Sequence, residues 1–166
     1  MLQPVVRRTW APRGETPILK SWDRHDRLSV MTSISVSPRR HRLHLCFNIH
    51  EHNIVSQDAV AFVGDLLRHT RRPLILVWDR WNVHRSAERK ITERWGQRVE
   101  CEYLPAYAPE LNPVEYAWST TKHCDLANFI PDDIQHLYNL MGESLDKHNL
   151  NYSRLKGFFS HAGLEL

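Results

Sequence analysis

The sequence predicts a mixed α/β domain in which strands and helices alternate along one chain. Two observations support this prediction: paired segments of alternating apolar and polar residues near the start, and short apolar runs separated by helical patterns later on. With 166 residues, of which 42% are hydrophobic, the chain is long enough to bury a core and too apolar for a disordered protein.

The first two elements are expected to be the strands of an antiparallel hairpin. Residues 28–37 and 42–50 alternate apolar with polar side chains, and residues 38–41 supply the turn between them. The Ser, Thr, His and Asn side chains of the hairpin should then face solvent. The apolar positions that should face the core are Leu28, Val30, Leu43, Leu45 and Phe47.

A helix and a buried strand are expected after the hairpin. The helix runs from Ser56 to the basic residues before Pro73, because apolar residues recur along it at helical spacing. Residues 74–78 form a continuous apolar run, which is typical of a strand that is buried on both faces. This strand ends at Asp79.

The second half of the chain continues the alternation of helices and strands. A helix is predicted over residues 85–95, with Gly96 as its C-cap, and a strand over residues 99–104. Two further helices are predicted over residues 112–124 and 131–147. This order of strands and helices is that of a mixed α/β protein.

Two acids stand where mixed α/β proteins place their chemistry. Asp79 lies at the carboxyl end of the buried strand, and Glu115 follows the next strand along the chain. Each acid also has a structural interpretation. Asp79 can terminate its strand, and Glu115 can form a capping box by reaching back to the amide of Asn112, with Pro113 at the first helical position.

Taken together, the two acids allow a second interpretation. Carboxylate oxygens are the ligands that hard divalent cations prefer. Two such ions about 4 Å apart can activate an attacking oxygen and stabilise a leaving one in phosphoryl transfer. Capping and metal binding are compatible roles for Glu115.

The segments around both acids resemble a known family. Asp79 lies in LILVWDRWNVHRS and is separated by 35 residues from Glu115, which lies in LPAYAPELNPVEYAWSTTK. The motif and this spacing resemble DDE-superfamily transposases of the mariner type, in particular their bacterial insertion-sequence branch. Two more segments, VVRRTWAPRGETP and LKGFFSHAGL, extend the resemblance over nearly the whole chain. It implies a ribonuclease-H-like mixed sheet flanked by helices.

The resemblance also implies an activity and a set of site residues. In the family, three acids bind two Mg²⁺ ions, for which Mn²⁺ can substitute, and the ions activate water to nick DNA before the freed 3′-hydroxyl attacks a target strand. By motif, Asp79 is the second catalytic and metal-binding acid and Glu115 is the third. Asn112 and Pro113 would set the start of the helix, and Trp118 would pack it on the sheet. His84 is either a phosphate contact or a structural residue.

One part of the family pattern is missing. The first acid is expected on a strand just before VVRRTWAPRG, and no acid precedes Glu15. Asp23 and Asp26 are the nearest alternatives, but they lie in an expected turn after that segment. We therefore expect a truncated catalytic domain over residues 1–150 that lacks its first, central strand, a C-terminal, partly helical tail over residues 151–166, and no activity of the fragment alone. We also expect this chain to lack the family's N-terminal helix-turn-helix DNA-binding region.

Basic residues suggest contact with DNA, both transposon ends and target. The formal net charge is +3, and Arg and His cluster in several short runs along the chain. Such runs are candidates for nonspecific, salt-sensitive binding to phosphates, although they also occur as solvated loops. The candidate DNA-binding residues are Arg39, Arg40, Arg42, Arg71, Arg72 and Lys122.

The cysteines and hydropathy indicate where the protein works. Three scattered Cys make no disulfide framework, which suits a reducing cytoplasm. We expect a bacterial cytoplasmic protein, associated with the nucleoid when bound to DNA. No apolar stretch approaches the roughly 20 residues of a membrane span. His123 and Cys124 lack the partners that a zinc site would need.

The sequence is compatible with two other functions. A noncatalytic remnant could bind DNA, or associate with subunits of a full-length transposase and modulate it in mixed oligomers. An RNA-cleaving hydrolase of the same broad fold is the third interpretation, and the proline-rich motif before Glu115 matches transposases better. Homo-oligomers are also compatible with the family resemblance.

Overall fold

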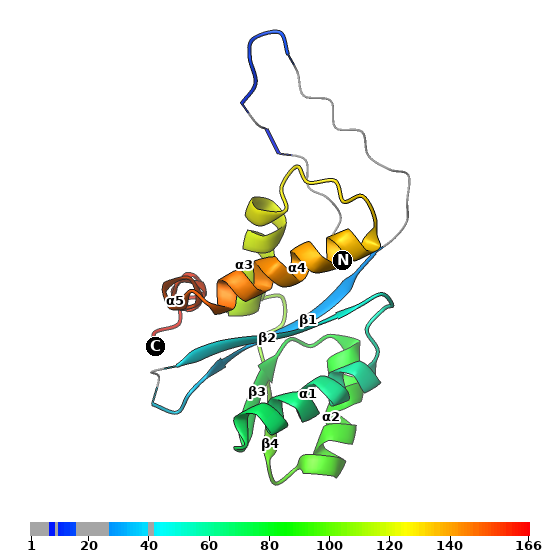
Figure 1. Cartoon of the computed structure of the whole chain (residues 1–166). Helices are drawn as coiled ribbons and strands as arrows, with labels where there is room; N and C mark the ends of the chain where they lie inside the picture. Colours follow the sequence, from blue (N-terminus) through cyan, green and yellow to red (C-terminus); the bar gives the residue numbers. More distant parts are fainter. Residues whose placement is uncertain (1–6, 9, 16–26, 40–41) are drawn as a thin grey trace.

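The computed structural model describes residues 7, 8, 10–15, 27–39 and 42–166. A hairpin of two strands crosses the middle of the molecule (Figure 1). Strand β1 (Ser29–Val36) pairs antiparallel with β2 (Leu43–His50), so that Ser29 lies opposite His50. The predicted hairpin is confirmed.

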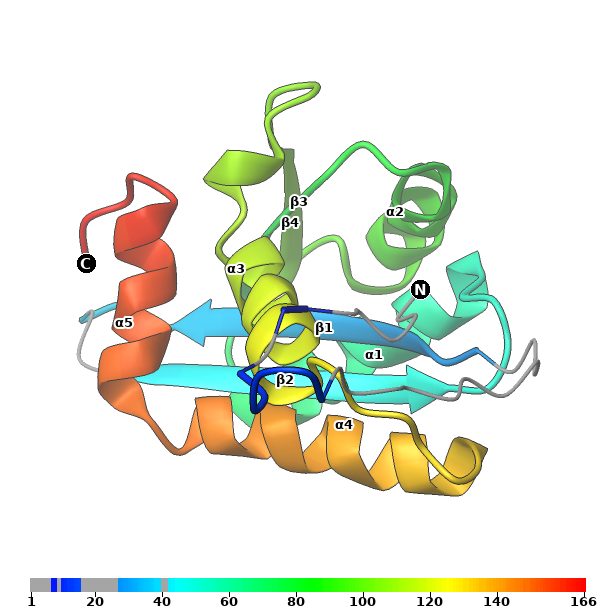
Figure 2. The ribbon, with the colours of Figure 1, turned by 90° about the horizontal axis from the view of Figure 1, so that it is seen from above.

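Three helices cover one face of the hairpin. They are α3 (Pro113–Thr120), α4 (Ile134–Asn149) and α5 (Tyr152–His161), with α4 lying alongside the strands and α3 crossing them (Figure 2). Buried side chains from the hairpin and these helices form the first core cluster. Its members include Leu28, Leu43, Leu45, Leu137, Met141, Leu145, Leu155, Phe158 and Phe159.

A second unit lies on the other side of the hairpin (Figure 1). It consists of α1 (Ser56–Thr70), β3 (Leu74–Trp78), α2 (Asn82–Trp95) and β4 (Val99–Tyr103). β3 and β4 are parallel, as the connection through α2 requires. Buried side chains of all four elements form the second core cluster, namely Ala59, Val63, Leu67, Trp78, Ala87, Ile91 and Val99.

The prediction that residues 74–78 are buried on both faces is wrong. Ile75 is 70% exposed and Val77 is 56% exposed. Only the alternate positions Leu74, Leu76 and Trp78 face the second core cluster. The strand therefore uses one face, and in the part of the chain that the structure describes no element covers the other.

The mixed sheet that the family resemblance implies, without its first strand, is divided in the described part of the chain. The described residues form two separate sheets of two strands each, β1 with β2 and β3 with β4. No described strand pairs with the second edge of β1 or of β3. The mixed α/β order is thus confirmed, and the described strands form two small sheets instead of one continuous sheet. The expected place of the first strand and the segment around Asp23 and Asp26 lie outside the described residues.

The prediction that the polar side chains of the hairpin face solvent is wrong for at least two of them. The hydroxyl oxygens of Thr32 and Ser33 are buried and have no hydrogen-bond partner. Their neighbour Met31 packs against the second core cluster, whereas Val30 and Ile34 pack against the first. Because protein covers both faces of the hairpin, alternation in the sequence does not separate inside from outside here.

Several helix limits differ from the prediction. α2 begins three residues earlier than residue 85, and α3 ends at Thr120, where a π-helical turn, η2 (Thr121–Asp125), replaces the last α-helical turn. α4 begins after Asp133, whose carboxylate accepts the His136 N–H at 2.7 Å. None of the described helices combines the length and the apolar character that crossing a membrane requires.

Candidate functional site

Asp79 stands directly after β3 and is fixed by the residues that follow it. Its Oδ1 accepts the backbone N–H of Trp81 at 3.0 Å, an Asx-type turn that leads the chain from the strand into α2. The same Oδ1 lies 2.7 Å from Nδ1 of His84. The Asp79 side chain is 54% exposed, so its carboxylate remains open to a ligand.

His84 lies in the first turn of α2 and is held on three sides. Its ring stacks on Trp78 with a centroid separation of 4.6 Å and meets the edge of Trp81 at 5.4 Å. An ionised carboxylate can only accept hydrogen bonds. Nδ1 of His84 must therefore be protonated, and its N–H donates to Asp79. Nε2 is then the nitrogen left for another partner, and the predicted phosphate contact stays a prediction.

Glu115 stands in the first turn of α3, after Asn112 and Pro113 have set the start of that helix. The Asn112 side chain accepts the N–H of Val114 at 3.1 Å, so the predicted N-cap is confirmed. The predicted capping box is wrong, because the Asn112 N–H donates to the carbonyl of Pro109 at 3.0 Å. A 3-10 turn, η1 (Pro109–Leu111), supplies that carbonyl and leaves the Glu115 carboxylate free of the cap.

In the structure the charge of Asp79 acts on the carboxyl group of Glu115. The pKa of Glu115 is raised, first because surrounding protein removes water and then because the negative charge of Asp79 is near. Glu115 is nonetheless exposed at the surface, so the shielding of its carboxylate is partial. A cation placed between two like charges would relieve this repulsion, and the oxygen donors fit a hard divalent ion such as Mg²⁺ or Mn²⁺.

No third ligand joins this pair in the ranges that the structure covers. Among the residues described, the only group of three or more His, Cys, Asp or Glu whose ligand atoms lie within 4.8 Å of one another is elsewhere, at His50, His52 and Asp58. Sequence reasoning missed that group, although the His-x-His spacing at the end of a strand could have indicated it. Asp23 and Asp26, the alternative first acids, lie outside the described residues.

Trp118 anchors α3 to the core. Trp118 is partly buried and packs against the first core cluster, next to the fully buried Ala117. This packing fixes the helix that carries Glu115 against the hairpin. The position of the acid thus depends on the cap at one end of the turn and on the core one turn later.

The structure does not bring the predicted DNA-binding residues to the acids as one patch. Arg39 and Arg42 flank the turn of the hairpin, Lys122 lies in η2, and Arg40 lies outside the described residues. Arg71 and Arg72 precede β3, whereas Asp79 follows it. A five-residue strand separates these two ends by roughly 17 Å.

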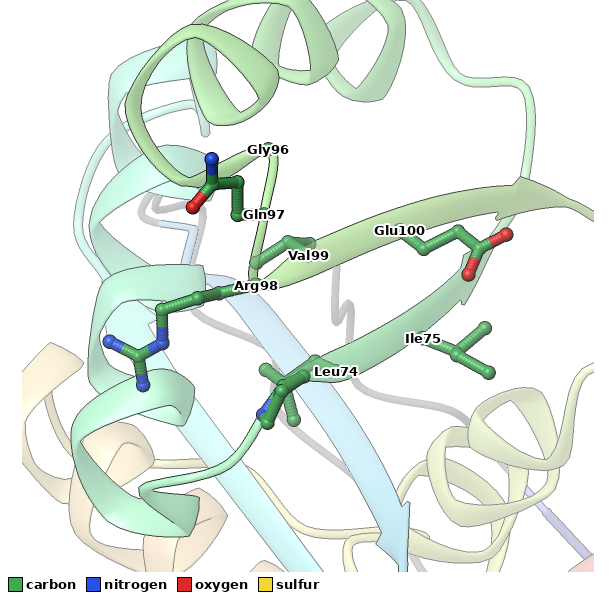
Figure 3. A pocket seen from close by; sticks show the side chains of 8 residues that line it. Leu74, Ile75, Gly96, Gln97, Arg98, Val99 and Glu100 are labelled. Carbon is green, nitrogen blue, oxygen red and sulfur yellow. The ribbon is translucent and has the colours of Figure 1, made fainter.

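A pocket of about 350 Å³ lies at the other end of the parallel pair (Figure 3). Pro73, Leu74 and Ile75 line it from the start of β3, and Val99 and Glu100 line it from the start of β4. It therefore opens at the amino ends of the strands, away from Asp79. Neither Asp79 nor Glu115 lines this pocket.

The comparisons with known proteins agree with this architecture. Residues 1–135 match the family described as DDE superfamily endonuclease. The fold is similar to a chain in the crystal structure of the Mos1 Strand Transfer Complex, with a TM-score of 0.53 and 13% sequence identity. That likeness covers 99% of this chain and 52% of the Mos1 chain, so the protein spans about half the length of its structural relative. No curated protein matches.

A family match over most of the chain, together with a ribonuclease-H-like fold, decides the classification. The chain belongs to the DDE superfamily endonuclease family.

Proposed function

We propose that this chain is the catalytic portion of a mariner-like transposase of the bacterial insertion-sequence branch. In this proposal Asp79 and Glu115 are two of its metal-binding acids, and DNA is the substrate. The observation that carries the proposal is that Asp79, directly after β3, and Glu115, in the first turn of α3, are near enough to interact: burial, and then the charge of Asp79, raises the pKa of Glu115. Family membership supports divalent metal use.

The roles of the residues follow from their contacts. Asp79 and Glu115 would each offer carboxylate oxygens to a divalent cation. When bound, such an ion supplies activation of a water oxygen that attacks a phosphodiester and releases a 3′-hydroxyl. His84 holds Asp79 in one orientation, and Asn112 and Trp118 hold the helix that carries Glu115.

The remaining parts of a transposition reaction rest on the family alone. Recognition of transposon ends, strand transfer to a target and assembly with further subunits are proposals, because the chain covers 52% of the Mos1 chain. A third acidic ligand would have to come from outside the described residues. Mg²⁺ is the expected ion, with two ions in a complete site and Mn²⁺ as a substitute.

Binding and cleavage should be measured separately. Mn²⁺ binding to the full chain can be followed by electron paramagnetic resonance, and nicking by the relaxation of a supercoiled plasmid in Mg²⁺ or Mn²⁺. Asp79→Asn and Glu115→Gln should each weaken Mn²⁺ binding, and any nicking should disappear with them. Glu110→Gln, which changes a nearby exposed carboxylate, is the matched control.

Each outcome bears on a different part of the proposal. Loss of Mn²⁺ binding in both variants, with Glu110→Gln unchanged, supports the assignment of the two acids. Unchanged Mn²⁺ binding in both variants removes them from a metal site. Mn²⁺ binding without nicking agrees with a catalytic portion that is inactive alone, and DNA binding then tests the second candidate function.

That second candidate is a noncatalytic module that binds DNA or associates with a full-length transposase. One observation favours it: no third His, Cys, Asp or Glu of the described residues joins Asp79 and Glu115 in a group of three possible ligands. Its mark would be DNA binding that weakens steeply with salt, because cations released from phosphates drive nonspecific association. Cleavage would stay absent in either metal. Failure to bind DNA at about 50 mM salt would argue against it.

A further inference from the structure

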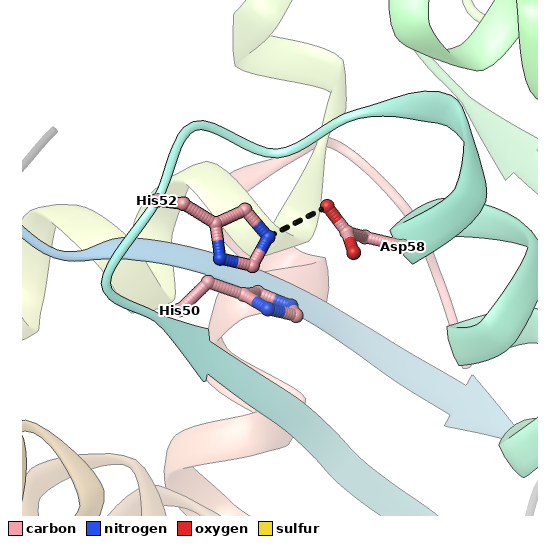
Figure 4. A group of neighbouring side chains, drawn as sticks. All are labelled: His50, His52 and Asp58. Atoms are coloured by element: carbon pink, nitrogen blue, oxygen red, sulfur yellow. Dashed lines mark hydrogen bonds and ion pairs between the residues drawn. The ribbon is translucent and has the colours of Figure 1, made fainter.

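A second cluster of metal-binding side chains lies at the junction of β2 and α1 (Figure 4). His50 is the last residue of β2, His52 lies in the following loop, and Asp58 lies in the first turn of α1. One ligand atom from each residue lies within 4.8 Å of the others. The cluster contains neither Asp79 nor Glu115.

The distances fit a small transition-metal ion. Nε2 of His52 lies 3.1 Å from Oδ2 of Asp58. Ligands of a tetrahedral Zn²⁺ with bonds of 2.0–2.1 Å are about 3.3 Å apart, close to that separation. The remaining ligand atoms, within 4.8 Å, would need to move by about 1.5 Å at most to reach the same spacing.

The imidazole of His50 provides an independent observation. Its Nε2 is buried and has no hydrogen-bond partner in the structure. A buried polar atom without a partner calls for an explanation, and a bound ion is one that fits the neighbouring ligands. The rings of His50 and His52 meet edge to face at a centroid distance of 5.0 Å, so neither ring blocks the other by stacking.

The carboxylate is fixed before any ion arrives. Oδ2 of Asp58 accepts the backbone N–H of Val55 at 2.9 Å, and this bond holds the side chain toward the loop. The Asp58 side chain is only 18% exposed, while that of His52 is 60% exposed. An outer hydrogen bond of this kind orients a metal ligand and strengthens its binding.

From these observations we infer that His50, His52 and Asp58 form a site for Zn²⁺ or a similar borderline divalent cation. Two imidazoles and one carboxylate are typical ligands of such ions, and nitrogen ligands disfavour Mg²⁺. Solvent would take the fourth position. The ion would tie the end of β2 to the start of α1 and fix the loop over residues 51–55. The inference does not depend on the proposed function.

The test uses the full chain and Zn²⁺ alone. Asp79→Asn/Glu115→Gln serves as the parent protein, so that Zn²⁺ cannot bind at the two acids of the candidate active site. Calorimetric titration should give one ion per chain, and Zn²⁺ should raise the Tm of the parent. His52→Ala and Asp58→Asn should each weaken Zn²⁺ binding by at least roughly tenfold, since outer contacts alone are worth that much.

A matched control comes from an unrelated pair in the same chain. His136 lies 3.1 Å from Asp132, the same spacing as His52 and Asp58, and no third ligand of the described residues joins it. His136→Ala should leave Zn²⁺ binding unchanged. Asp58→Asn keeps an oxygen acceptor for the Val55 N–H, so its loss of binding would not reflect loss of the turn.

The readout distinguishes a site from nonspecific binding. Stoichiometric Zn²⁺ binding that His52→Ala and Asp58→Asn weaken and His136→Ala does not would support the inference. Equal Zn²⁺ affinity in the parent, His52→Ala and His136→Ala would overturn it. An equally large Tm increase with Mg²⁺ would also overturn it, because that preference belongs to oxygen ligands.

Discussion

The imidazole of His84 lies between the carboxylate of Asp79 and the indole of Trp78. Its Nδ1 is 2.7 Å from Oδ1 of Asp79, and its ring is nearly parallel to Trp78 at 10°. Trp78 ends β3 and His84 lies in the first turn of α2, so the contact closes the turn that carries the acid. His84 is therefore a positioning residue for Asp79.

The first prediction concerns this hydrogen bond. His84→Ala should weaken Mn²⁺ binding on the order of tenfold, because Asp79 loses the partner that orients it. His84→Asn places an N–H donor close to the Nδ1 position and should recover most of the affinity, whereas His84→Gln mimics Nε2 and should not. Titration of Mn²⁺ by electron paramagnetic resonance checks all three. Equal affinities in the three variants would limit His84 to a role in packing.

The second prediction concerns charge at Glu115. Because burial and then Asp79 raise its pKa above 4.5, the folded protein holds this proton more tightly than the unfolded chain does. Its contribution to stability is thus full below pH 4.5 and is lost as pH rises through the folded pKa. Glu115→Gln removes the repulsion and should raise the Tm slightly at pH 7.5 and not at pH 4.

The measurement is a Tm series over this pH range, with Glu110→Gln as the control. Saturating Mg²⁺ should reduce the difference between the parent chain and Glu115→Gln at pH 7.5, since a bound cation screens both carboxylates. A Tm of Glu115→Gln below that of the parent at pH 7.5 would show that the charge stabilises the fold and contradict the prediction.

Local sequence patterns predicted most helices and strands of this fold. The errors concern burial, which depends on contacts between segments far apart in the sequence. The hairpin and the cap at Asn112 depend on residues close in sequence. Burial of Ile75 depends on whether another element covers its face, and an apolar run cannot reveal that. Glu115 looked like half of a capping box because its spacing from Asn112 was right. The preceding 3-10 turn offered the Asn112 N–H a nearer carbonyl at Pro109.

The candidate site divides in the same way. Asp79 and Glu115 were found from strand ends and motif spacing, and their electrostatic coupling required the folded chain. The His50, His52 and Asp58 cluster was missed because it joins a strand end to the next helix start across a loop. The basic residues were found by composition, which does not indicate where a folded chain places them.

The third prediction concerns the cap of α3. Asn112→Ala removes the acceptor of the Val114 N–H and should cost about 1 kcal/mol of unfolding free energy. For a domain of this size that corresponds to a Tm lower by roughly 2–4 °C. Asn112→Asp keeps the acceptor and should stay near the parent Tm. If Asn112→Ala and Asn112→Asp melt together, the cap does not stabilise the helix that carries Glu115.

The fourth prediction rests on a buried polar network between η2, α4 and α5. His148 is fully buried, and its Nδ1 lies 3.1 Å from the guanidinium of Arg154. Because a guanidinium can only donate, Nδ1 must accept, and the neutral ring then carries its proton on Nε2. That nitrogen donates to Oγ1 of Thr121 at 2.9 Å. Asp125 lies 3.6 Å from the same nitrogen.

This arrangement predicts loss of stability in mild acid. Burial lowers the pKa of His148 below 6.5; Asp125 partly offsets this, and Arg154 adds to it. The unfolded chain therefore binds more protons, so the contribution of His148 is full above pH 6.5 and is lost as pH falls through the folded pKa. His148→Gln should flatten the fall in Tm between pH 7.5 and pH 5. His44 should account for part of the remaining slope, because burial and then His69 lower its pKa as well. If the slope is unchanged in His148→Gln, protonation of His148 does not contribute to the loss of stability in acid.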